Sequence, residues 1–359
     1  MEQQNQLAAT VLETGAAGLG SAATLKLLEK EPGAGSAFGK EAWSLWKTHF
    51  GDQALELASA LRAGQPELFT RRVRWHRSAF AAREVPETLL LSAMRALREV
   101  VQEELPPQSA GTAISCLDAA INDFESAPEE TPQTMLDTAI PAHRIAARYV
   151  EAVLDGDARA AMKLVLDAVA AGTLDTRSAC LDVLVPAQQE FGLRWHLGKL
   201  GIAEEHLGTA TTQRLLTLLT AAAERPVVNG KTVVVAGVAG DPHDMGVRLL
   251  ADFLELAGWN NICLGGDVPP GEIARAVHVF GADLLVLSAT LGRHIERVKE
   301  TIAALGSRED DAVKVLVGGH AFTGSGDLWR TVGADGYGRS ADEAVSLARD
   351  LVGLNAAES

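Results

Sequence analysis

The 359-residue sequence is short of cysteine and of long hydrophobic runs, and each shortage excludes a class of protein. Only three cysteines occur, and they lie far apart at Cys116, Cys180 and Cys263, without the close spacing of metal ligands. We therefore expect reduced thiols in a cytoplasmic protein rather than a disulfide framework. No apolar run approaches the ~18 residues of a membrane span, and the polar N-terminus is unlike a signal peptide.

Basic residues are also scarce relative to acidic ones. The chain has 32 Lys and Arg residues against 47 Asp and Glu residues, which gives a formal net charge of −15. Nucleic acids and anionic membranes attract basic surfaces, so we expect neither as a partner. Aromatic residues make up 5% of the chain, yet six tryptophans outnumber two tyrosines. Packing against a flat ligand and filling a core both explain tryptophan at this rate.

The first 126 residues carry apolar residues at helical spacing, interrupted by glycines and prolines. This pattern predicts five or so helices, over residues 7–28, 38–61, 67–83, 89–105 and 109–124. Helices of this number and length predict a bundle or a globin-like domain over residues 1–126. A stretch rich in Pro, Glu and Thr follows, and residues 127–139 are expected to form a linker.

The rest of the chain divides into a helical part and a part in which strands and helices alternate. Residues 140–226 predict a compact cap of four helices. Between residues 230 and 355, strands are predicted over 232–238, 261–264, 284–288, 313–317 and 336–338, with helices between them. This alternation predicts a flavodoxin-like, doubly wound parallel sheet with its ligand at the carboxyl ends of the strands. The expected fold class is therefore α plus α/β.

Three loops at that edge of the sheet have unusual compositions. They are Asp241-Pro-His243-Asp-Met-Gly246, Ser288-Ala-Thr290 and Gly318-Gly319. A histidine flanked by two aspartates and close to glycines is typical of a place where backbone and imidazole approach a large ligand. The alternative is an ordinary strand–helix turn with a surface histidine.

In this order and spacing the three loops resemble the cobalamin-binding domain, in which Asp-x-His-x-x-Gly, Ser-x-Leu and Gly-Gly recur. The resemblance covers roughly residues 140–355, and Tyr337 stands where that family has a final ligand contact. Thr290 replaces the usual leucine, which should alter the packing around the nucleotide tail of the cofactor. The resemblance implies that His243 replaces the cofactor's own dimethylbenzimidazole as the lower ligand of cobalt. That base then enters a slot beside the sheet, where Gly246, Gly318 and Gly319 leave room.

The chemistry of cobalt is consistent with this assignment. A neutral imidazole nitrogen binds the metal, and the other ring nitrogen needs an acceptor that fixes its tautomer and basicity. Asp241 lies two residues from His243 and can be this acceptor, with Ser288 extending the hydrogen-bond relay.

A helical segment before the sheet indicates which form of cobalamin is bound. Trp195 is followed by nine residues and then by Glu205-His206. This spacing resembles the signature of the adenosylcobalamin photoreceptors of the CarH type. The resemblance implies that Trp195 and Glu205 embrace the 5′-deoxyadenosyl group above the corrin, and that His196 can ligate cobalt after light breaks the Co–C bond. The alternative is a core tryptophan, with Glu205 and His206 on a solvated helix face.

The N-terminal helices carry one further candidate, an arginine-rich stretch in which Trp75 and His76 are embedded. Its arginines, which can grip carboxylates and phosphates in bidentate fashion, are Arg71, Arg72, Arg74 and Arg77. The alternative is an exposed basic helix on an acidic protein. No helix-turn-helix domain of the CarH type is apparent in residues 1–126. The domain arrangement instead resembles the photocobilins, which pair cobalamin with biliverdin.

On that resemblance the arginines hold the bilin propionates, with Trp75 and His76 near the pyrrole rings. Cys116 is a candidate thioether site, although no motif supports a covalent bond.

The leading hypothesis is a light sensor that binds adenosylcobalamin base-off with His243 on cobalt, together with biliverdin as a second chromophore. Photolysis would change the conformation or the oligomeric state of a homo-oligomer, and an unidentified signalling partner would respond. The sequence shows no catalytic triad or Walker loop, so we expect no enzyme. The alternative is a corrinoid methyl carrier for a methyltransferase, and a third possibility makes the N-terminal domain a pigment-free signalling module.

Overall fold

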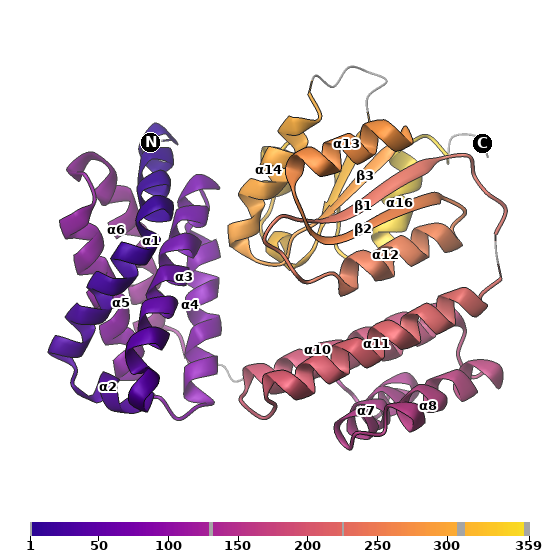
Figure 1. Ribbon diagram of the computed structural model, residues 1–359, viewed down its shortest axis with the longest axis horizontal. Coiled ribbons are helices and arrows are strands. Elements are labelled where there is room, and N and C mark those ends of the chain that lie inside the picture. Colours follow the sequence, from indigo (N-terminus) through magenta and orange to yellow (C-terminus); the bar gives the residue numbers. More distant parts are fainter. Residues whose placement is uncertain (1, 129–131, 225, 307–312, 355–359) are drawn as a thin grey trace.

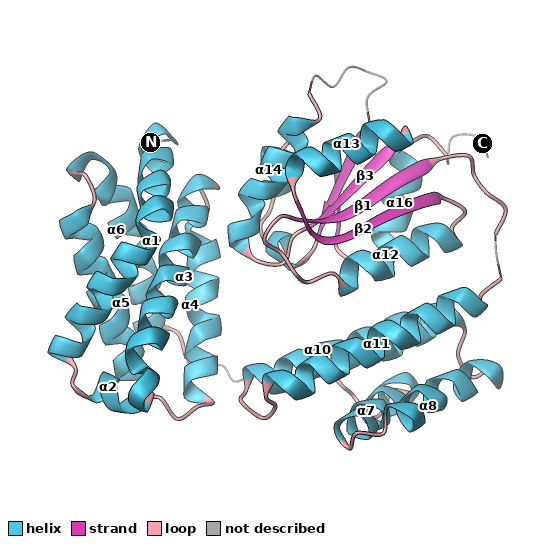
Figure 2. Cartoon of the chain, viewed as in Figure 1, coloured by secondary structure: helices cyan, strands magenta, loops and turns pink. Residues whose placement is uncertain are grey.

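The computed structural model describes residues 2–128, 132–224, 226–306 and 313–354 (Figure 1). The N-terminal helices form one group, further helices form a second, and a parallel sheet covered by helices forms the third (Figure 2). The predicted fold class is therefore confirmed. No helix among the described residues is both long and apolar enough to cross a membrane.

The N-terminal group follows the predicted helix pattern closely. Its elements are α1 (Glu2–Lys30), α2 (Gly33–Ala37), η1 (Gly39–Glu41), α3 (Ala42–Arg62), α4 (Pro66–Ala81), α5 (Glu87–Glu104) and α6 (Pro107–Ser126). Pro66 and Pro107 occupy first helical positions, where a missing N–H removes no hydrogen bond. Helix α1 runs unbroken through its glycines because it packs closely on α3. At Gly20 a Cβ would lie 2.7 Å from the carbonyl oxygen of Lys47.

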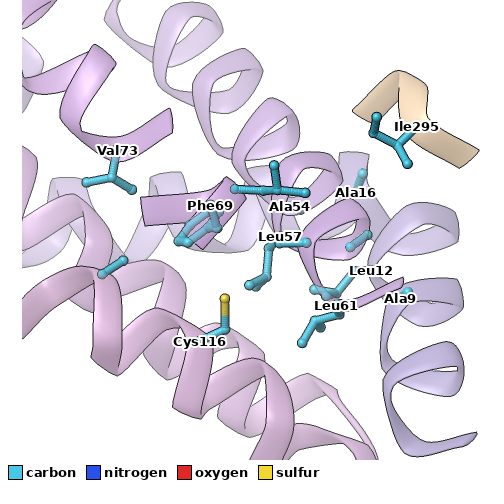
Figure 3. Close-up of a cluster of buried hydrophobic side chains, with 14 of the residues drawn as sticks. Ala9, Leu12, Ala16, Ala54, Leu57, Leu61, Phe69, Val73, Cys116 and Ile295 are labelled. Carbon is cyan, nitrogen blue, oxygen red and sulfur yellow. The ribbon is translucent and has the colours of Figure 1, made fainter. Parts of the chain in front are cut away.

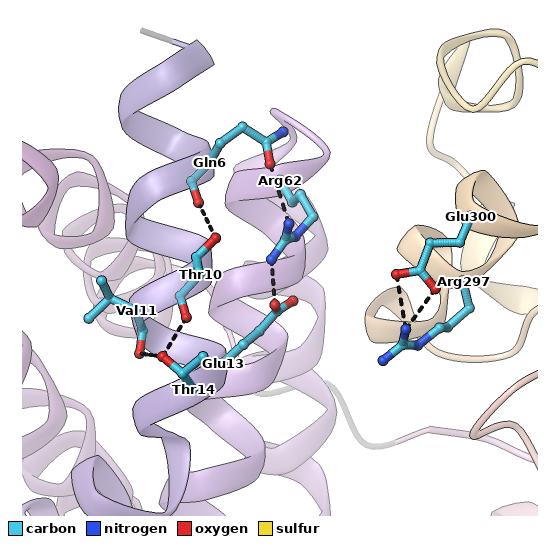
Figure 4. A network of polar contacts seen from close by, with 8 residues as sticks. All are labelled: Gln6, Thr10, Val11, Glu13, Thr14, Arg62, Arg297 and Glu300. Atoms are coloured by element: carbon cyan, nitrogen blue, oxygen red, sulfur yellow. Dashed lines mark hydrogen bonds and ion pairs between the residues drawn. The ribbon is translucent and has the colours of Figure 1, made fainter. Parts of the chain in front are cut away.

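Polar contacts complete this helix pair at its surface. Arg62, at the end of α3, donates a hydrogen bond to the side-chain oxygen of Gln6 at 3.4 Å and forms an ion pair with Glu13 of α1 (Figure 4). The buried apolar side chains continue beyond the N-terminal group. One cluster includes Leu12 of α1, Leu57 of α3 and Ile295, which lies at the start of a helix of the third group (Figure 3). The N-terminal helices therefore pack against the sheet region.

The second group is helical and lies where the sequence predicted a cap of four helices. It consists of α7 (Pro141–Leu154), α8 (Ala158–Ala170), α9 (Thr176–Ser178), the π-helical turn η2 (Ala179–Leu184), α10 (Val185–His196) and α11 (Ile202–Ala222). The π turn ends at Leu184, two residues before Pro186. In a regular α-helix the proline ring would clash with the carbonyl group four residues earlier, and its nitrogen donates no hydrogen bond. Tyr149 and Phe191 are fully buried in the centre of this group.

The third group is a five-stranded parallel sheet. Its strands are β1 (Thr232–Val238), β2 (Asn260–Val268), β3 (Leu284–Ser288), β4 (Lys314–Gly318) and β5 (Gly336–Gly338), in the order β2-β1-β3-β4-β5. The other elements are α12 (Met245–Leu256), α13 (Pro270–Phe280), η3 (Gly292–His294), α14 (Ile295–Ala304), η4 (His320–Phe322), α15 (Leu328–Thr331) and α16 (Ala341–Leu351).

The strand order reverses direction between β1 and β3, which is the point where such sheets bind ligands. The register pairs Gly237 with Ser288 and Ser288 with Gly318. The loops after β1, β3 and β4 therefore leave the sheet side by side.

Two glycines of α1 provide a matched test of its packing. Gly20→Ala should lower the free energy of unfolding by about 1–3 kcal/mol, because its methyl group meets backbone atoms of α3. Gly18 is exposed and has no atom within 4 Å of a built Cβ, so Gly18→Ala should instead stabilise the helix by about 0.5–1 kcal/mol. Urea unfolding measures both changes, and equal effects of the two substitutions would contradict the close packing.

Candidate functional site

The site is built around the carboxylate of Asp241, which is only 1% exposed. One oxygen, Oδ1, accepts from the backbone N–H of His243 at 3.2 Å and lies 2.7 Å from its Nδ1. The other, Oδ2, accepts from the backbone N–H of Thr290 at 2.6 Å and lies 3.2 Å from Nδ1 of His294. Burial alone would raise the pKa of Asp241, but these hydrogen bonds outweigh it and hold the pKa well below its usual range.

His243 is oriented for metal binding. Its Nδ1 faces Asp241, so Nε2 is the ring nitrogen left to bind a metal, while more than half of the side chain is exposed. The hydrogen bond to Asp241 raises the pKa of the imidazole, and Glu205 of α11 adds to this effect from the cap. An oriented, basic imidazole at the switch point fits the lower ligand of a corrinoid cobalt. The donor set therefore suits the cofactor that the loops predict.

The structure changes the expected hydrogen-bond relay. Among the described residues, the side chain of Ser288 makes no hydrogen bond to Asp241, and His294 lies there instead. His294 follows Ser288 by six residues and stands where η3 joins α14. The sequence signal was a histidine shortly after the third strand, but nothing local showed that it would turn back toward Asp241.

The predicted glycines have different structural roles. Gly319 has φ of +96°, and a Cβ there would lie 2.3 Å from the carbonyl oxygen of Ala289, so the turn itself requires glycine. A Cβ at Gly318 would lie 3.2 Å from the carbonyl oxygen of Gly338. Gly246 is exposed, with no atom within 4 Å of a built Cβ. Of the three glycines, only Gly246 therefore borders space that no other atom of the described protein fills.

The last predicted residue of the sheet, Tyr337, lies on β5. It is partly buried, and its ring centre is 6.0 Å from that of Phe322 in η4.

Helix α11 brings the cap to the loop that carries His243. Gln213 of α11 donates a hydrogen bond to Asp244 at 3.0 Å. Glu205 is partly buried and accepts a hydrogen bond from Thr209 at 2.8 Å, whereas the His206 side chain is 73% exposed and 3.7 Å from Glu205. Helix α11 therefore brings Glu205 close enough to His243 to affect the pKa of its imidazole.

His196 is held by the N-terminal helices. It is 5% exposed, and its Nε2 lies 2.8 Å from the hydroxyl of Ser78 on α4. The ring centre of Trp75 is 4.4 Å from that of His196 and 6.4 Å from that of Trp195. Arg83 donates hydrogen bonds to the carbonyl oxygens of Trp195 and His196. Burial lowers the pKa of His196. Helix α4 thus contacts the end of the cap where the adenosyl group was predicted.

The predicted arginine cluster does not converge on one pocket. Arg71 donates to the carbonyl oxygen of Thr323, and Arg74 pairs with Asp123. Arg77 pairs with Glu87 at 2.6 Å. The guanidinium of Arg72 lies 4.1 Å from the ring centre of Trp75 and near Glu56. Each arginine therefore has its own partner within the protein.

Two other N-terminal candidates lie in the interior. His76 is buried and is 2.7 Å from the side-chain amide of Gln53, and burial lowers its pKa well below the ordinary value. Cys116 is buried among apolar side chains (Figure 3), and burial raises the pKa of its thiol to about 12. A thiol in this state is a poor nucleophile, which argues against the suggested thioether attachment.

Two segments of the chain match known protein families. Residues 231–346 match a B12 binding domain, and residues 145–220 match a second family that carries the same description. A corrinoid protein of Desulfitobacterium hafniense is 30% identical over 210 residues, which cover 56% of this chain and 95% of the relative. The chain belongs to the B12-binding corrinoid proteins. Cobalamin binding, the coarser part of the predicted function, is thereby confirmed.

Other relatives of this chain have names that describe different roles. The dimethylamine corrinoid protein of Methanosarcina barkeri is 31% identical over 189 residues, covering 51% of this chain and 86% of the relative. The transcriptional repressor CarH of Myxococcus xanthus is 34% identical over 158 residues, covering 44% of this chain and 52% of the repressor. The structure of the M. barkeri monomethylamine corrinoid protein aligns with a TM-score of 0.52 at 22% identity, over 58% of this chain and 98% of that one. This last likeness shows the fold alone.

Substitutions at two glycines should separate cofactor binding from folding. Gly246→Leu should weaken cobalamin binding at least about tenfold without lowering the melting temperature, because its side chain enters space that the protein leaves open. Gly319→Ala should lower the melting temperature, because it clashes with Ala289 in a strained turn. Binding titration and thermal unfolding of the corrinoid protein measure both effects. Normal cobalamin affinity in Gly246→Leu would place the cofactor elsewhere.

The buried His76 makes stability depend on pH. Its pKa is lowered in the folded chain, so below pH 6.5 the unfolded chain binds a proton that the folded chain does not. The free energy of unfolding should therefore decrease as the pH falls through 6.5, and His76→Gln should remove about 1.4 kcal/mol of this decrease in total between pH 7.5 and 5.5. Urea unfolding between pH 7.5 and 5.5 measures the decrease, and an unchanged decrease in the variant would contradict a neutral buried His76.

Proposed function

We propose that this corrinoid protein is a light sensor that carries adenosylcobalamin, with His243 as the lower ligand of cobalt. Trp195 and Glu205 are assigned to the upper face, beside the adenosyl group. The cofactor supplies a cobalt–carbon bond that light can cleave. The protein supplies the two faces of the pocket and a domain that responds when the upper face changes.

The contact between α4 and the end of the cap carries this proposal. Trp75, Ser78 and Arg83 all touch Trp195 or His196, next to the proposed adenosyl pocket. A methyl carrier must present the upper face of its corrinoid to a partner enzyme, and a domain seated here would stand in the way. In a sensor, the same contact is useful, because a change at Trp195 reaches the N-terminal helices directly.

Loss of the adenosyl group would change how the cap packs against the N-terminal helices. Release of His196 from Ser78 would free it to approach cobalt once the adenosyl group has left. The resulting change in exposed surface would alter a homo-oligomer or a contact with a signalling partner. No catalytic reaction is assigned to the chain itself.

A second chromophore remains part of the proposal. A cavity of about 190 Å³ lies between α4 and the cap, and its lining includes Phe38, Trp75, Phe80, Trp195 and His196. Its aromatic walls suit a flat ligand, but it is smaller than the roughly 300–1,000 Å³ of usual ligand pockets. Biliverdin would need this cavity to widen, and at least some of the arginines to leave their present partners. Its assignment rests on the domain architecture.

A methyl carrier is the second candidate, and the relatives favour it. The dimethylamine and trimethylamine corrinoid proteins of Methanosarcina barkeri share 31% and 28% identity with this chain. These relatives also align over 86% and 94% of their length, whereas CarH aligns over 52%. On this proposal, methylcobalamin would be bound, and the N-terminal helices would have to swing away from the cap during each transfer.

Reconstitution with adenosylcobalamin in the dark, followed by green light, distinguishes the two candidates. We expect a lasting change in the absorption spectrum and in the elution volume. Trp195→Ala and Glu205→Gln should each weaken adenosylcobalamin binding about tenfold or more, because the proposal places both side chains against the adenosyl group. Hydroxocobalamin binding should change little, because His243 depends chiefly on Asp241 and only secondarily on Glu205.

Trp43→Ala is the matched control, since Trp43 is 42% exposed and lies on α3 rather than on a helix of the cap. An unchanged spectrum under illumination would contradict the light sensor. Equal loss of methylcobalamin and adenosylcobalamin binding in Trp195→Ala would favour the methyl carrier.

A further inference from the structure

We infer that His294 is a positioning residue for the lower cobalt ligand, and that it ties the orientation of His243 to the seating of the N-terminal helices on the sheet. The inference rests on the proposed assignment of His243 to cobalt. It gives His294 a role at the cobalt site. It also connects that site physically to the N-terminal helices, which lie outside both B12-binding matches.

The first step is the geometry at Asp241. Its carboxylate has one oxygen for His243 and one for Thr290 and His294. Because Asp241 is buried, the groups that hold Oδ2 fix the direction of Oδ1, and with it the ring of His243. His294 is the one side chain among the described residues that contacts Oδ2, at 3.2 Å, and it is 3% exposed. Carboxylates that orient metal-bound histidines depend in this way on their own hydrogen-bond partners.

Three groups contact the ring nitrogens of His294. Nδ1 lies 3.2 Å from the carboxylate of Asp241 and 3.4 Å from the backbone N–H of Leu291, and Nε2 lies 3.5 Å from Arg293. The shorter contact, with the charged carboxylate, favours a proton on Nδ1 over a lone pair facing Leu291. A proton on Nδ1 lets the ring donate to Asp241, and leaves Nε2 to accept from Nε of Arg293 at 3.5 Å. The opposite tautomer would turn a lone pair toward the carboxylate. His294 therefore acts as a donor that holds Asp241 in place.

The second step is the support of His294 by α3. The turn η3, which ends at His294, faces a stripe of three polar residues spaced to lie on one side of α3: Asp52, Glu56 and Ser59. Ser59 donates to the carbonyl oxygen of Gly292 at 2.5 Å, and Arg293 lies 3.5 Å from Asp52. A Cβ at Gly292 would lie 3.3 Å from the carboxylate of Glu56, so the two segments fit closely.

The chain of contacts is therefore continuous. It runs from α3 through η3 to His294, then through Asp241 to His243. Any shift of the N-terminal helices that moves η3 also moves the donor that holds Asp241. The expected consequence is that seating of the N-terminal helices favours ligation of cobalt by His243 over ligation by the cofactor's own base.

The test uses full-length protein uniformly labelled with ¹⁵N and loaded with hydroxocobalamin, then reduced to cob(II)alamin. The EPR signal shows a doublet splitting when a labelled protein nitrogen binds cobalt, and a triplet when the cofactor's unlabelled base does. Wild type should give the doublet. His294→Phe removes the donor but keeps a ring, and should shift signal toward the triplet and weaken binding about 10–100-fold.

His294→Asn restores a donor near the position of Nδ1 and should recover most of the doublet. His278→Phe, at an exposed histidine of α13, is the matched control and should behave as wild type. Ser59→Ala breaks the link to α3 without touching the sheet, and should shift part of the signal in the same direction. Thermal unfolding of each variant identifies any that fails to fold, and His294→Asn and Ser59→Ala then carry the test.

The outcomes separate the inference from the proposed function. A wild-type doublet and affinity in His294→Phe would overturn the positioning role. A shift in His294→Phe with none in Ser59→Ala would overturn the link to the N-terminal helices. His243→Ala serves as the reference: if it leaves the doublet intact, the assignment of His243 to cobalt is wrong, whatever His294 does.

Discussion

The buried carboxylate of Asp241 is the feature on which the site depends. A charge that is 1% exposed is tolerated only when hydrogen bonds replace its lost water, and here each oxygen has such partners. These partners come from the loops after β1 and β3 and from the start of α14. The carboxylate therefore joins, at the switch point of the sheet, segments that are far apart in the chain. Its low pKa keeps it charged, and that charge fixes the tautomer of His243.

The N-terminal helices contact the proposed cofactor site from two directions. Through α4 and Arg83, which follows it, they hold Trp195 and His196, on the side assigned to the upper ligand. Through α3 they hold η3 and His294, on the side assigned to the lower ligand. On the proposed function, α3 and α4 together contact both sides of the cofactor site, so a change in either axial ligand would reach the N-terminal helices. The N-terminal domain therefore contacts residues on the sides assigned to both axial positions of the cofactor.

Much of this was predictable because its signals are local. Apolar periodicity predicted the helices and strands, and the ends of β1, β3 and β4 carried the loops that indicated cobalamin. The position of His294 beside Asp241 was not predictable, because it depends on a contact across the sheet edge between residues 53 positions apart. The Ser59–Gly292 contact joins residues 233 positions apart. The arginines at 71, 72, 74 and 77 show the same limit, since helical spacing cannot tell whether they share a ligand or find separate partners.

Where the N-terminal helices meet the sheet, two buried polar groups lack hydrogen-bond partners among the described residues. Glu56 is 4% exposed, and its nearest cation, Arg72, lies 3.9 Å away, beyond hydrogen-bonding distance. Glu56 Oε1 and Arg72 Nε are buried without a hydrogen-bond partner among the described residues, and burial raises the pKa of Glu56. Burying these charged groups without hydrogen bonds costs free energy, because they lose their water. Separating the two surfaces would hydrate them again and remove this cost. The apolar contact at Ile295 opposes that separation. The same interface therefore combines apolar packing, which holds the N-terminal helices on the sheet, with a buried polar pair that opposes this packing.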